Sequence, residues 1–493
     1  EPSPMNVVWA FGLFPRRFAN PQIMVGTIDS QFILGDAQSG KLSWHTVNDA
    51  MQKVKPKGIE FHLLSFIGSG AAQAKLTVKD QTGGSTPVTN LFGLEAAYRS
   101  NVSKGVWDND TAIQITYVYP ASATIAANSL SGATTLFLNS VVGLRVGGIV
   151  EIIHSATSYG FKITSIDENA RSITGVPDTV GSAFTIGDVV KLKYFTIQCF
   201  RRDHRGQISQ IATPFDDVPL SMEPEDVASY LPTVLANHPL FFFFFKASPT
   251  DEGDGWLLRF PAEISGSNYD YLTGGLNGTD PAGTSDWTSL QATIALYDRG
   301  IFAVMSAEST SAAVHKSYEA FCKSLQSHPM YVASLPYFGS DWQSLEAASL
   351  PFIKRQNWVQ FLNVYGWRYV PDPVGDSGAV VQIPVHGGVL GKWIQIIYSG
   401  YVHRAVAETR FILDGYVDGP APVAEDSFSA KNPAGWTDEI RTALYNAGVN
   451  IVQNVPGFGV ILRNFRTPSD DVRVRDAHIH AINQLIKFTS EFN

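Results

Sequence analysis

The sequence has very few cysteines and few charged side chains. Of its 493 residues only Cys199 and Cys322 are cysteines, and 16% are charged, whereas 44% are hydrophobic. Two cysteines so far apart exclude a disulfide framework, and we expect each to be a small buried apolar side chain in a reducing compartment. The large apolar share excludes a disordered chain and favours a folded one with much buried or subunit-facing surface.

Features of nucleic-acid binding, secretion and membrane insertion are also missing. Acidic residues outnumber basic ones by 45 to 36, which gives a net charge of −9 without any long basic run. Nucleic-acid binders usually present a basic face, so we expect no direct nucleic-acid binding. The first residues lack the basic and apolar regions of a secretion signal. The phenylalanine run at 241–245 is far shorter than the roughly 20 apolar residues that span a bilayer.

No motif of an enzyme or a cofactor site occurs. The glycine-rich stretch 68–74 lacks the third glycine and the acidic residue of a dinucleotide fingerprint, and no phosphate loop or nucleophile elbow is present. The acidic stretch 251–255 lacks the terminal glutamate of a calcium loop. His478 and His480 would point to different sides of a helix, so a surface or interface role is favoured over a metal pair. We expect no enzyme, no metal and no cofactor.

The composition changes along the chain and divides it into expected domains. Residues 26–120 and 193–280 are interpreted as one discontinuous mixed α/β domain. Between them, residues 121–192 are rich in Ser, Thr, Gly and Val, and their short strands and glycine turns predict an inserted small β-barrel or β-roll domain. Residues 281–493 alternate helices with strands, which predicts a mostly parallel sheet flanked by helices. The predicted fold class is therefore a multidomain α+β or α/β protein.

Residues 1–25 are apolar, contain prolines and lack helical periodicity. We expect them to form an extended arm that leaves its own subunit, because exposed apolar side chains aggregate unless a neighbour covers them. Deleting this segment should leave folded subunits that no longer assemble. The candidate inter-subunit arm residues are Val7, Val8, Trp9, Phe11, Leu13 and Phe14.

Four motifs follow one another in the C-terminal half. They are "LTGGLNGTDP" at 272–281, "VYGWRYVPDPVGDSGAVVQIPVHGGVLGKW" at 364–393, "SGYVHRAVAETRF" at 399–411 and "AGVNIVQNVPGFGVILRNFRTPSDD" at 447–471. A weaker fifth motif, "KGVWDNDTAIQI", lies at 104–115. In order and spacing this set resembles the contractile tail sheath proteins of myophages and related contractile injection systems.

Individual positions carry the resemblance, and a few depart from the family pattern. Asn277 stands where the family usually has aspartate, and Gly366 and Val406 stand where it usually has proline. The last motif predicts a hairpin of two short apolar strands near the end of the chain. The family-motif residues are Trp367, Asp372, Pro384, Gly387, Gly391, Gly448, Asn450, Gly457, Gly459, Arg466 and Thr467.

The resemblance implies a structural subunit without catalytic activity. Sheath subunits form six-membered rings stacked helically around a tail tube, and contraction drives the tube through the host envelope with energy stored in the extended state. The implied partners are further copies of the chain, the tail tube protein, and baseplate and tail terminator or neck proteins. The implied location is the virion tail, assembled in the bacterial cytoplasm, with residues 281–493 nearest the tube and the inserted β domain outside.

A charged cluster in the predicted final helix is the candidate tube-facing or ring-neighbour surface. Contacts there should be weak and polar, because a contracting sheath must release its tube. The candidate residues are Asp470, Asp471, Arg473, Arg475 and Lys487.

The inserted domain is expected to be dispensable for polymerisation. Its flanking strands, 112–119 and 194–200, can pair with each other once the insert is removed. Joining Tyr119 to Lys193 through a short Gly-Ser linker should therefore give contraction-competent cylinders of smaller outer diameter.

Two other classes of protein remain open. One is a β-rich phage hydrolase or depolymerase, which would need a pair of carboxylates in a cleft. The other is a capsid, tube or decoration protein, which would share the tendency to assemble. Negative-stain microscopy separates them, since hollow striated cylinders indicate a sheath and dispersed monomers with glycan-cleaving activity indicate the enzyme.

Overall fold

The computed structural model describes most of the chain and separates it into two compact units. The described residues are 6–24, 30–37, 41–53, 59–79, 90–178, 183–211, 231–233, 235–246, 256–308, 310–338, 341–353, 359–371, 380–398, 438–455, 459–462 and 465–469. The first unit contains residues up to Ala71 together with those from Asn277 onward, and the second unit is Ala72–Leu276.

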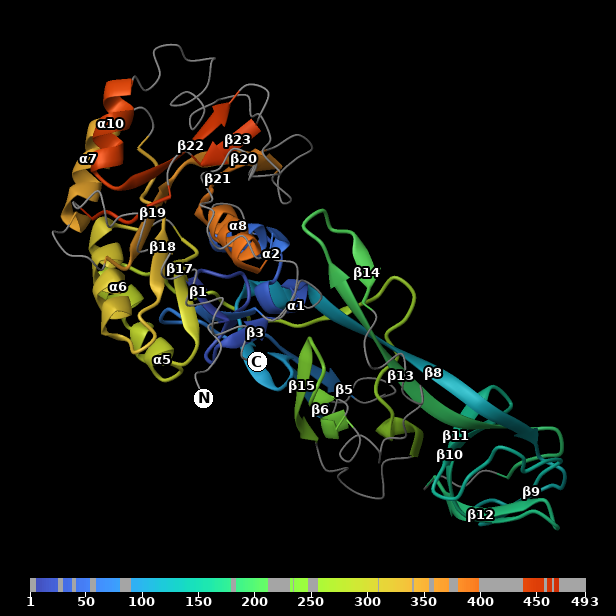
Figure 1. Cartoon of the computed structure of the whole chain (residues 1–493). Coiled ribbons are helices and arrows are strands. Elements are labelled where there is room, and N and C mark those ends of the chain that lie inside the picture. Colours follow the sequence, from blue (N-terminus) through green and yellow to red (C-terminus); the bar gives the residue numbers. More distant parts are fainter. Residues whose placement is uncertain are drawn as a thin grey trace. The chain divides into compact units, whose positions relative to one another are not determined.

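The first unit is built on a sheet with the strand order β23-β22-β19-β18-β17-β1-β4-β3 (Figure 1). Parallel pairing runs from β4 through β1, β17, β18 and β19 to β22, and only the outer pairs β3–β4 and β22–β23 are antiparallel. The prediction of a mostly parallel sheet is confirmed. The strands are β1 (Val7–Gly12), β3 (Gln22–Met24), β4 (Glu60–Ser65), β17 (Ile301–Ser306), β18 (Met330–Ala333), β19 (Phe361–Tyr365), β22 (Val449–Val455) and β23 (Gly459–Leu462).

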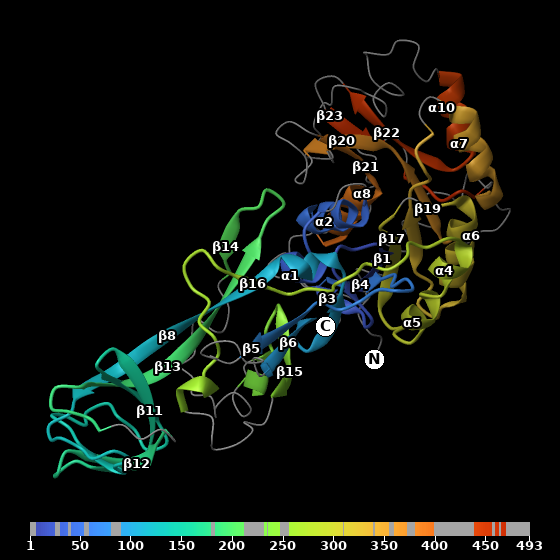
Figure 2. The same ribbon diagram turned by 180° about the vertical axis from the view of Figure 1, so that it is seen from behind.

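Helices cover this sheet on both sides. In both views α6, α7 and α10 lie on one side of the sheet and α2 and α8 on the other (Figures 1 and 2). Strands covered on both faces are apolar throughout, and every residue of β17, β18 and β19 is buried. The helices are α1 (Ser30–Leu34), α2 (Ser43–Lys53), α4 (Thr284–Thr288), α5 (Gln291–Ala295), α6 (Ala312–Ser324), α7 (Trp342–Ser349), α8 (His386–Tyr398) and α10 (Asp438–Asn446). Smaller elements are β2 (Arg17–Phe18), the 3-10 turn η4 (Leu350–Phe352) and the hairpin of β20 (Trp367–Pro371) and β21 (Val380–Pro384).

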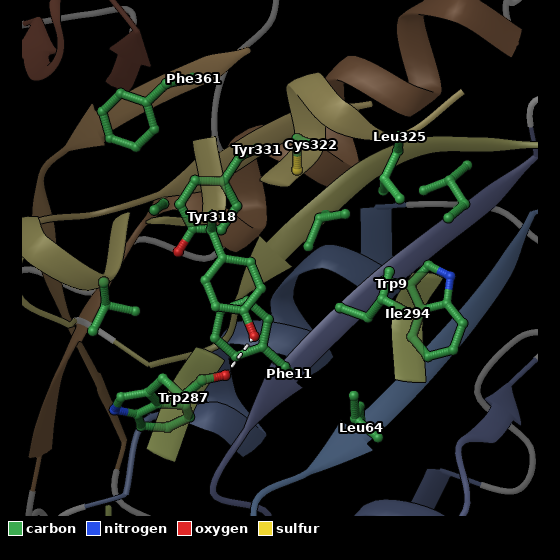
Figure 3. Close-up of a cluster of buried hydrophobic side chains, with 14 of the residues drawn as sticks. Trp9, Phe11, Leu64, Trp287, Ile294, Tyr318, Cys322, Leu325, Tyr331 and Phe361 are labelled. Atoms are coloured by element: carbon green, nitrogen blue, oxygen red, sulfur yellow. Dashed lines mark hydrogen bonds between the residues drawn. The ribbon is translucent and has the colours of Figure 1, made fainter. Parts of the chain in front are cut away.

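A row of aromatic rings fills the core between this sheet and α6 (Figure 3). Phe11 stacks on Tyr318 with ring centroids 4.2 Å apart, Tyr318 lies 5.3 Å from Tyr331, and Tyr331 lies 5.8 Å from Phe361. The Tyr318 hydroxyl donates a hydrogen bond of 2.8 Å to the carbonyl of Trp287. Because buried hydroxyls need a partner, this bond allows a tyrosine to occupy the middle of the stack.

The predicted N-terminal arm is wrong for residues 6–24. β1 lies in the interior of the first unit's sheet, hydrogen-bonded to β17 on one side and β4 on the other. The apolar side chains that suggested an arm are covered by their own chain, and their exposed fractions do not exceed 8% for Val7, Val8, Trp9, Phe11, Leu13 and Phe14. An apolar segment without helical periodicity is equally the pattern of a central parallel strand.

The predicted domain boundaries therefore differ from the observed units. Residues before 72 fold with the C-terminal part, because β1 and β4 complete its sheet. The sequence suggested instead that most of this segment belonged with the β-rich middle of the chain.

The second unit contains a long two-stranded ribbon that continues into a smaller β structure. β8 (Thr111–Thr124) pairs with β13 (Val189–Arg202) over nearly its whole length, and Ile113 lies opposite Cys199. The sheet order is β16-β8-β13-β10-β11-β12-β9, with β14 paired to the end of β13. The remaining strands are β9 (Thr135–Phe137), β10 (Ile149–His154), β11 (Thr157–Asp167), β12 (Ser172–Pro177), β14 (Ile208–Gln210) and β16 (Asp270–Tyr271).

Residues 121–194 have a hydrophobic core of their own, which includes Ile152, Phe161 and Ile173. The rest of the second unit holds a sheet in which β6 (Asn90–Tyr98) pairs with β5 (Lys75–Lys79), β7 (Asn101–Lys104) and β15 (Phe241–Lys246). Two 3-10 turns, η1 (Val106–Asp110) and η3 (Trp256–Arg259), complete it. The molecule is thus a mixed α/β protein with several sheets.

Both cysteines are free and buried, as the sequence predicted. Within the described residues, no helix combines the length and the apolar character needed to cross a bilayer.

Candidate functional site

The last sequence motif forms the predicted hairpin at one end of the first unit's sheet. β22 and β23 pair antiparallel from Val452–Leu462 to Val455–Gly459. β22 also pairs in parallel with β19, where Asn450 lies opposite Val364. The turn with Gly457 lies outside the described residues. β23 is the terminal strand of the sheet, so the motif supplies one of its two edges.

Asn450 connects three segments of this region through its buried amide. Its Nδ2 donates to the carbonyl of Asn363 at 3.1 Å and to that of Arg466 at 2.9 Å, and its Oδ1 accepts the Arg466 backbone N–H at 2.8 Å. The side chain of Asn450 is completely buried. An amide is the only neutral side-chain group that can donate twice and accept here. The motif asparagine therefore fixes β22 to β19 and to the segment beyond β23.

Arg466 and Gly448 complete the same cluster. The Arg466 guanidinium carbon lies 3.2 Å from the ring centroid of Tyr445 on α10, and only 8% of this arginine is exposed. Gly448 has φ +74°, and a Cβ there would lie 2.2 Å from a ring carbon of Pro468. Thr467 is buried between these two contacts. The motif residues Gly448, Asn450, Arg466 and Thr467 thus form one packed cluster across the β22–β23 hairpin, which we call the Asn450 cluster.

The second motif places a helix N-terminus directly against α2. A Cβ on Gly387 would lie 2.1 Å from the Thr46 carbonyl oxygen, and a Cβ on Gly388 would lie 2.7 Å from an Asp49 carboxylate oxygen. The glycines thus allow α8 and α2 to approach at backbone distance. Gly391, one turn further along α8, is buried. Trp367 lies opposite Pro384 in the β20–β21 hairpin, and Asp372 lies outside the described residues.

Two histidines are buried in the first unit beside this helix contact. His386 Nε2 donates to the Ser306 carbonyl at 2.5 Å, and burial lowers the pKa of His386 to about 4. His315 donates through Nε2 to the Ser334 carbonyl at 3.2 Å, so its Nδ1 accepts from the Tyr331 hydroxyl at 2.9 Å. Burial lowers the pKa of His315 to about 3. Both imidazoles are therefore neutral near pH 7, and their hydrogen bonds join strands and helices of the first unit.

Glu308 binds the start of α2. Its Oε1 accepts from Leu42 N–H at 3.2 Å, Ser43 N–H at 3.0 Å and the Ser43 hydroxyl at 2.5 Å. Burial raises the pKa of this carboxyl, and these hydrogen bonds oppose the rise. A carboxylate at a helix N-terminus is stabilised by the unpaired N–H groups there. This contact could not be predicted from local sequence, because the partners lie more than 260 residues apart.

The first motif is tied to a buried arginine that the sequence analysis did not single out. Arg17 is 1% exposed, donates to the Asn277 carbonyl at 2.7 Å and lies 3.7 Å from Asp280, which also pairs with Lys41 at 2.5 Å. Burial lowers the pKa of Arg17, and Asp280 partly opposes this. These contacts join the motif to the loop after β1.

The second unit has a buried lysine at the base of the inserted β structure. Lys193 is 2% exposed, its Nζ lies 3.9 Å from the Tyr117 ring centroid and 3.8 Å from a Glu151 carboxylate oxygen, and Tyr119 donates to the same carboxylate at 2.7 Å. Burial lowers the pKa of Lys193, and Glu151 counteracts this. The register of β8 against β13 shifts at this point, between Leu192 and Tyr194.

The described residues contain no cluster of three or more metal-ligating side chains. His478 and His480 lie outside them, as do the candidate tube contacts Asp470, Asp471, Arg473, Arg475 and Lys487, and the third motif at 399–411. What the structure does bring together are motif residues in buried, packed positions. Among the described residues, this arrangement fixes the β22–β23 hairpin to β19 and α10.

Comparison with known proteins returns contractile tail components. No family model matches the sequence, and no curated protein matches it. Among solved structures, the sheath tail protein of Desulfitobacterium hafniense is 10% identical, with 100% of this chain and 79% of that chain covered and a TM-score of 0.46. The sheath tail protein of Listeria innocua is 9% identical, with 99% and 75% covered and a TM-score of 0.44.

A chain of the anti-feeding prophage baseplate is 17% identical over 43% of this chain and 49% of that chain, with a TM-score of 0.30. The chain therefore resembles sheath tail proteins in structure comparison as well as in its sequence motifs.

Proposed function

We propose that this chain is the sheath subunit of a contractile phage tail or related injection system. Its copies stack as six-membered rings around a tail tube and contract to drive the tube through a bacterial envelope. The work comes from subunit contacts that are better satisfied in the contracted state, since no nucleotide is consumed. The subunit has a structural role and catalyses no reaction.

The observation that carries this proposal is the Asn450 cluster. The motif positions that resemble sheath proteins are 16 residues apart at Asn450 and Arg466, yet they meet in one buried network. The side chain of Asn450 bonds the backbone of Arg466 in both directions, so two positions of the last motif depend on each other physically. The resemblance in sequence therefore corresponds to one physical unit, the hairpin of β22 and β23.

That hairpin has the form that strand addition between subunits requires. Among the described strands, β23 is the end of the sheet, and an edge strand presents backbone groups to which another chain's strand can bond. Asn450 connects the hairpin to β19, and Arg466 connects it to α10. A strand added to β23 would therefore be coupled through the hairpin to the body of the first unit. Such a joint can keep subunits linked while they pivot during contraction.

The partners follow from this role. The subunit would contact further copies of itself, the tail tube protein, and baseplate and terminator or neck proteins. It would occupy the virion tail after assembly in the bacterial cytoplasm. Direct contact with nucleic acid is not part of the proposal, which agrees with the net charge of −9.

Negative-stain microscopy of the purified full-length chain, alone and with its tube protein, tests this function. Hollow cylinders with regular striations, present in a long narrow and a short wide form, are expected. The Asn450→Ala variant should form fewer cylinders, and Asn169→Ala, in an exposed turn of the second unit, should form as many as the wild type. Dispersed monomers that cleave surface glycans would overturn the proposal in favour of a hydrolase.

A further inference from the structure

The first motif contains the only Asn-Gly pair of the whole sequence, Asn277-Gly278. An asparagine followed by glycine can react with its own backbone, because glycine has no side chain to hinder the approach of its nitrogen to the neighbouring amide. Both residues are half-buried, so water can reach them. The proposed function makes no use of this chemistry.

The reaction is the loss of ammonia from the asparagine side chain. The Gly278 nitrogen bonds to Cγ of Asn277, which closes a cyclic succinimide and releases the side-chain nitrogen as ammonia. Water then opens the ring at either carbonyl and leaves aspartate or isoaspartate, without oxidation or reduction. The nitrogen attacks only after it has lost its proton. The negative charge that this creates is shared with the backbone carbonyl oxygen of Asn277.

The structure holds a guanidinium at that oxygen. Arg17 donates to the Asn277 carbonyl at 2.7 Å and to the Phe14 carbonyl at 3.2 Å, and it is 1% exposed. Its carboxylate partner Asp280 lies 3.7 Å away and is 53% exposed. The positive charge is therefore fixed on the carbonyl of the reacting peptide group and is only partly neutralised by Asp280.

The attacking nitrogen lies in a loop that the fold fixes on both sides. The Thr279 N–H donates to the Ser69 carbonyl at 3.0 Å, and Arg17 holds the other side of the peptide pair. Gly278 has φ +73°, and a Cβ there would lie 2.7 Å from the Gly68 carbonyl oxygen. Among the described residues, no protein group accepts the Gly278 N–H. The proton that must leave is thus not held by a hydrogen bond within the fold.

We propose that Asn277 deamidates in the folded protein and that Arg17 accelerates the reaction by stabilising the deprotonated peptide group. A charged donor fixed at an oxygen that gains negative charge is the arrangement that stabilises oxyanions in active sites. Each conversion adds a carboxylate to the loop that Arg17 binds and makes the net charge of −9 more negative. This inference concerns the chain's own covalent chemistry and does not depend on the proposed function.

Mass spectrometry of the purified full-length chain tests the proposal. Samples are kept folded, or unfolded in urea, at the same mildly alkaline pH. The peptide with Asn277 should gain the mass difference between an amide and a carboxyl about threefold to tenfold faster in the folded chain, because the guanidinium hydrogen bond exists only there. The exposed Asn139 and Asn169, followed by serine and alanine, serve as internal references that should stay amides. A folded chain that deamidates at Asn277 no faster than the unfolded one would overturn the proposal.

Two variants separate the charge from the shape of the loop. Asp280→Ala removes the exposed carboxylate that partly neutralises Arg17, so it should raise the folded-state rate at Asn277 by about twofold or more. Arg17→Gln should lower that rate to the unfolded value, and where circular dichroism shows that this variant does not fold, Asp280→Ala decides. The matched control Glu439→Ala removes an exposed carboxylate of α10 and should leave the rate unchanged. Equal rates for Asp280→Ala and the control would refute the role of Arg17.

Discussion

Replacing Asn450 by alanine should destabilise the first unit strongly. The change removes three hydrogen bonds of 2.8 to 3.1 Å from a completely buried side chain. It leaves the Arg466 N–H, the Arg466 carbonyl and the Asn363 carbonyl without that partner, and each buried unsatisfied group costs about 1–3 kcal/mol. Partial relaxation and entry of water reduce the sum, so a loss of about 3 kcal/mol is expected.

Urea unfolding followed by tryptophan fluorescence measures this loss. The signal reports mainly on the first unit, which contains Trp9, Trp287 and Trp393 in its core. With a denaturant slope of about 1–3 kcal/mol per molar, the midpoint should fall by about 1 M or more. The control Asn169→Ala should stay within about 0.5 kcal/mol of the wild type.

The variant Asn450→Asp provides a second test of the same contact. It keeps the shape and the acceptor but loses both donated bonds and introduces a buried charge, so it should be at least as unstable as the alanine variant. A midpoint within the control's range for either variant would refute the idea that the Asn450 cluster holds the hairpin in place.

Three further predictions concern buried groups in both units. Glu151→Gln should cost about 3 kcal/mol in a thermal unfolding experiment because it removes a carboxylate beside the buried Lys193 charge, whereas the double variant Glu151→Gln with Lys193→Met, which removes both charges, should recover most of this loss. Because the folded pKa of His386 is about 4 and the unfolded one about 6.5, the unfolded state binds more protons between these values. The share of stability that depends on His386 should therefore fall by about 3 kcal/mol as pH drops from 6.5 to 4, and His315, whose folded pKa is about 3, should add a similar loss. His386→Gln should remove about half of this dependence in urea titrations at several pH values, and an unchanged slope would contradict the assignment. Gly448→Ala should lose at least about 2 kcal/mol, since it adds a clash with a proline ring to an unfavourable φ, whereas Gly206→Ala, with φ +78° in open space, should lose only about 1 kcal/mol.

Local pattern predicted the regular elements of the first unit well. The alternation of helices and strands after residue 281 gave the parallel sheet, because buried parallel strands are short apolar runs that helices must separate. The hairpin at 449–462 was likewise readable from its two apolar runs and glycines. These features depend on residues close together in sequence.

The long-range contacts that determine the fold could not be predicted from the sequence, since they join segments that lie far apart in the chain. The sequence analysis interprets β1 as part of an arm. An apolar segment must be covered, but its sequence does not show whether its own chain or a neighbouring subunit covers it. The buried roles of Glu308 and Arg17 could not be predicted from the sequence. Their partners, the N-terminus of α2 and the Asn277 carbonyl, come close to them only in the folded chain. In the site, the motif identified Asn450 and Arg466 as candidate residues. The hydrogen bonds between them could be seen only in the folded structure.

The Lys193 contact also bears on removal of the inserted domain, which stays a prediction. The strands that flank the insert are already paired, with Tyr117 opposite Phe195. Deletion of residues 120–192 would remove Glu151, however, and leave the buried lysine charge without its carboxylate. The deletion should therefore be made with Lys193→Met, so that failure to assemble reports on the domain and not on a stranded charge.

The position of β1 between β4 and β17 constrains the order in which the molecule can form as it is synthesised. Its pairing with β17 joins Val8 to Ala303, so a ribosome must translate almost 300 further residues before the partner exists. The second unit, Ala72–Leu276, lies entirely within that interval and can complete its own core first. Until then β1 can pair only with β4. Its pairing with β17 should be slow, because it closes a loop of almost 300 residues. A chaperone that binds exposed apolar strands should associate with nascent chains shorter than about residue 306 and leave once β17 emerges.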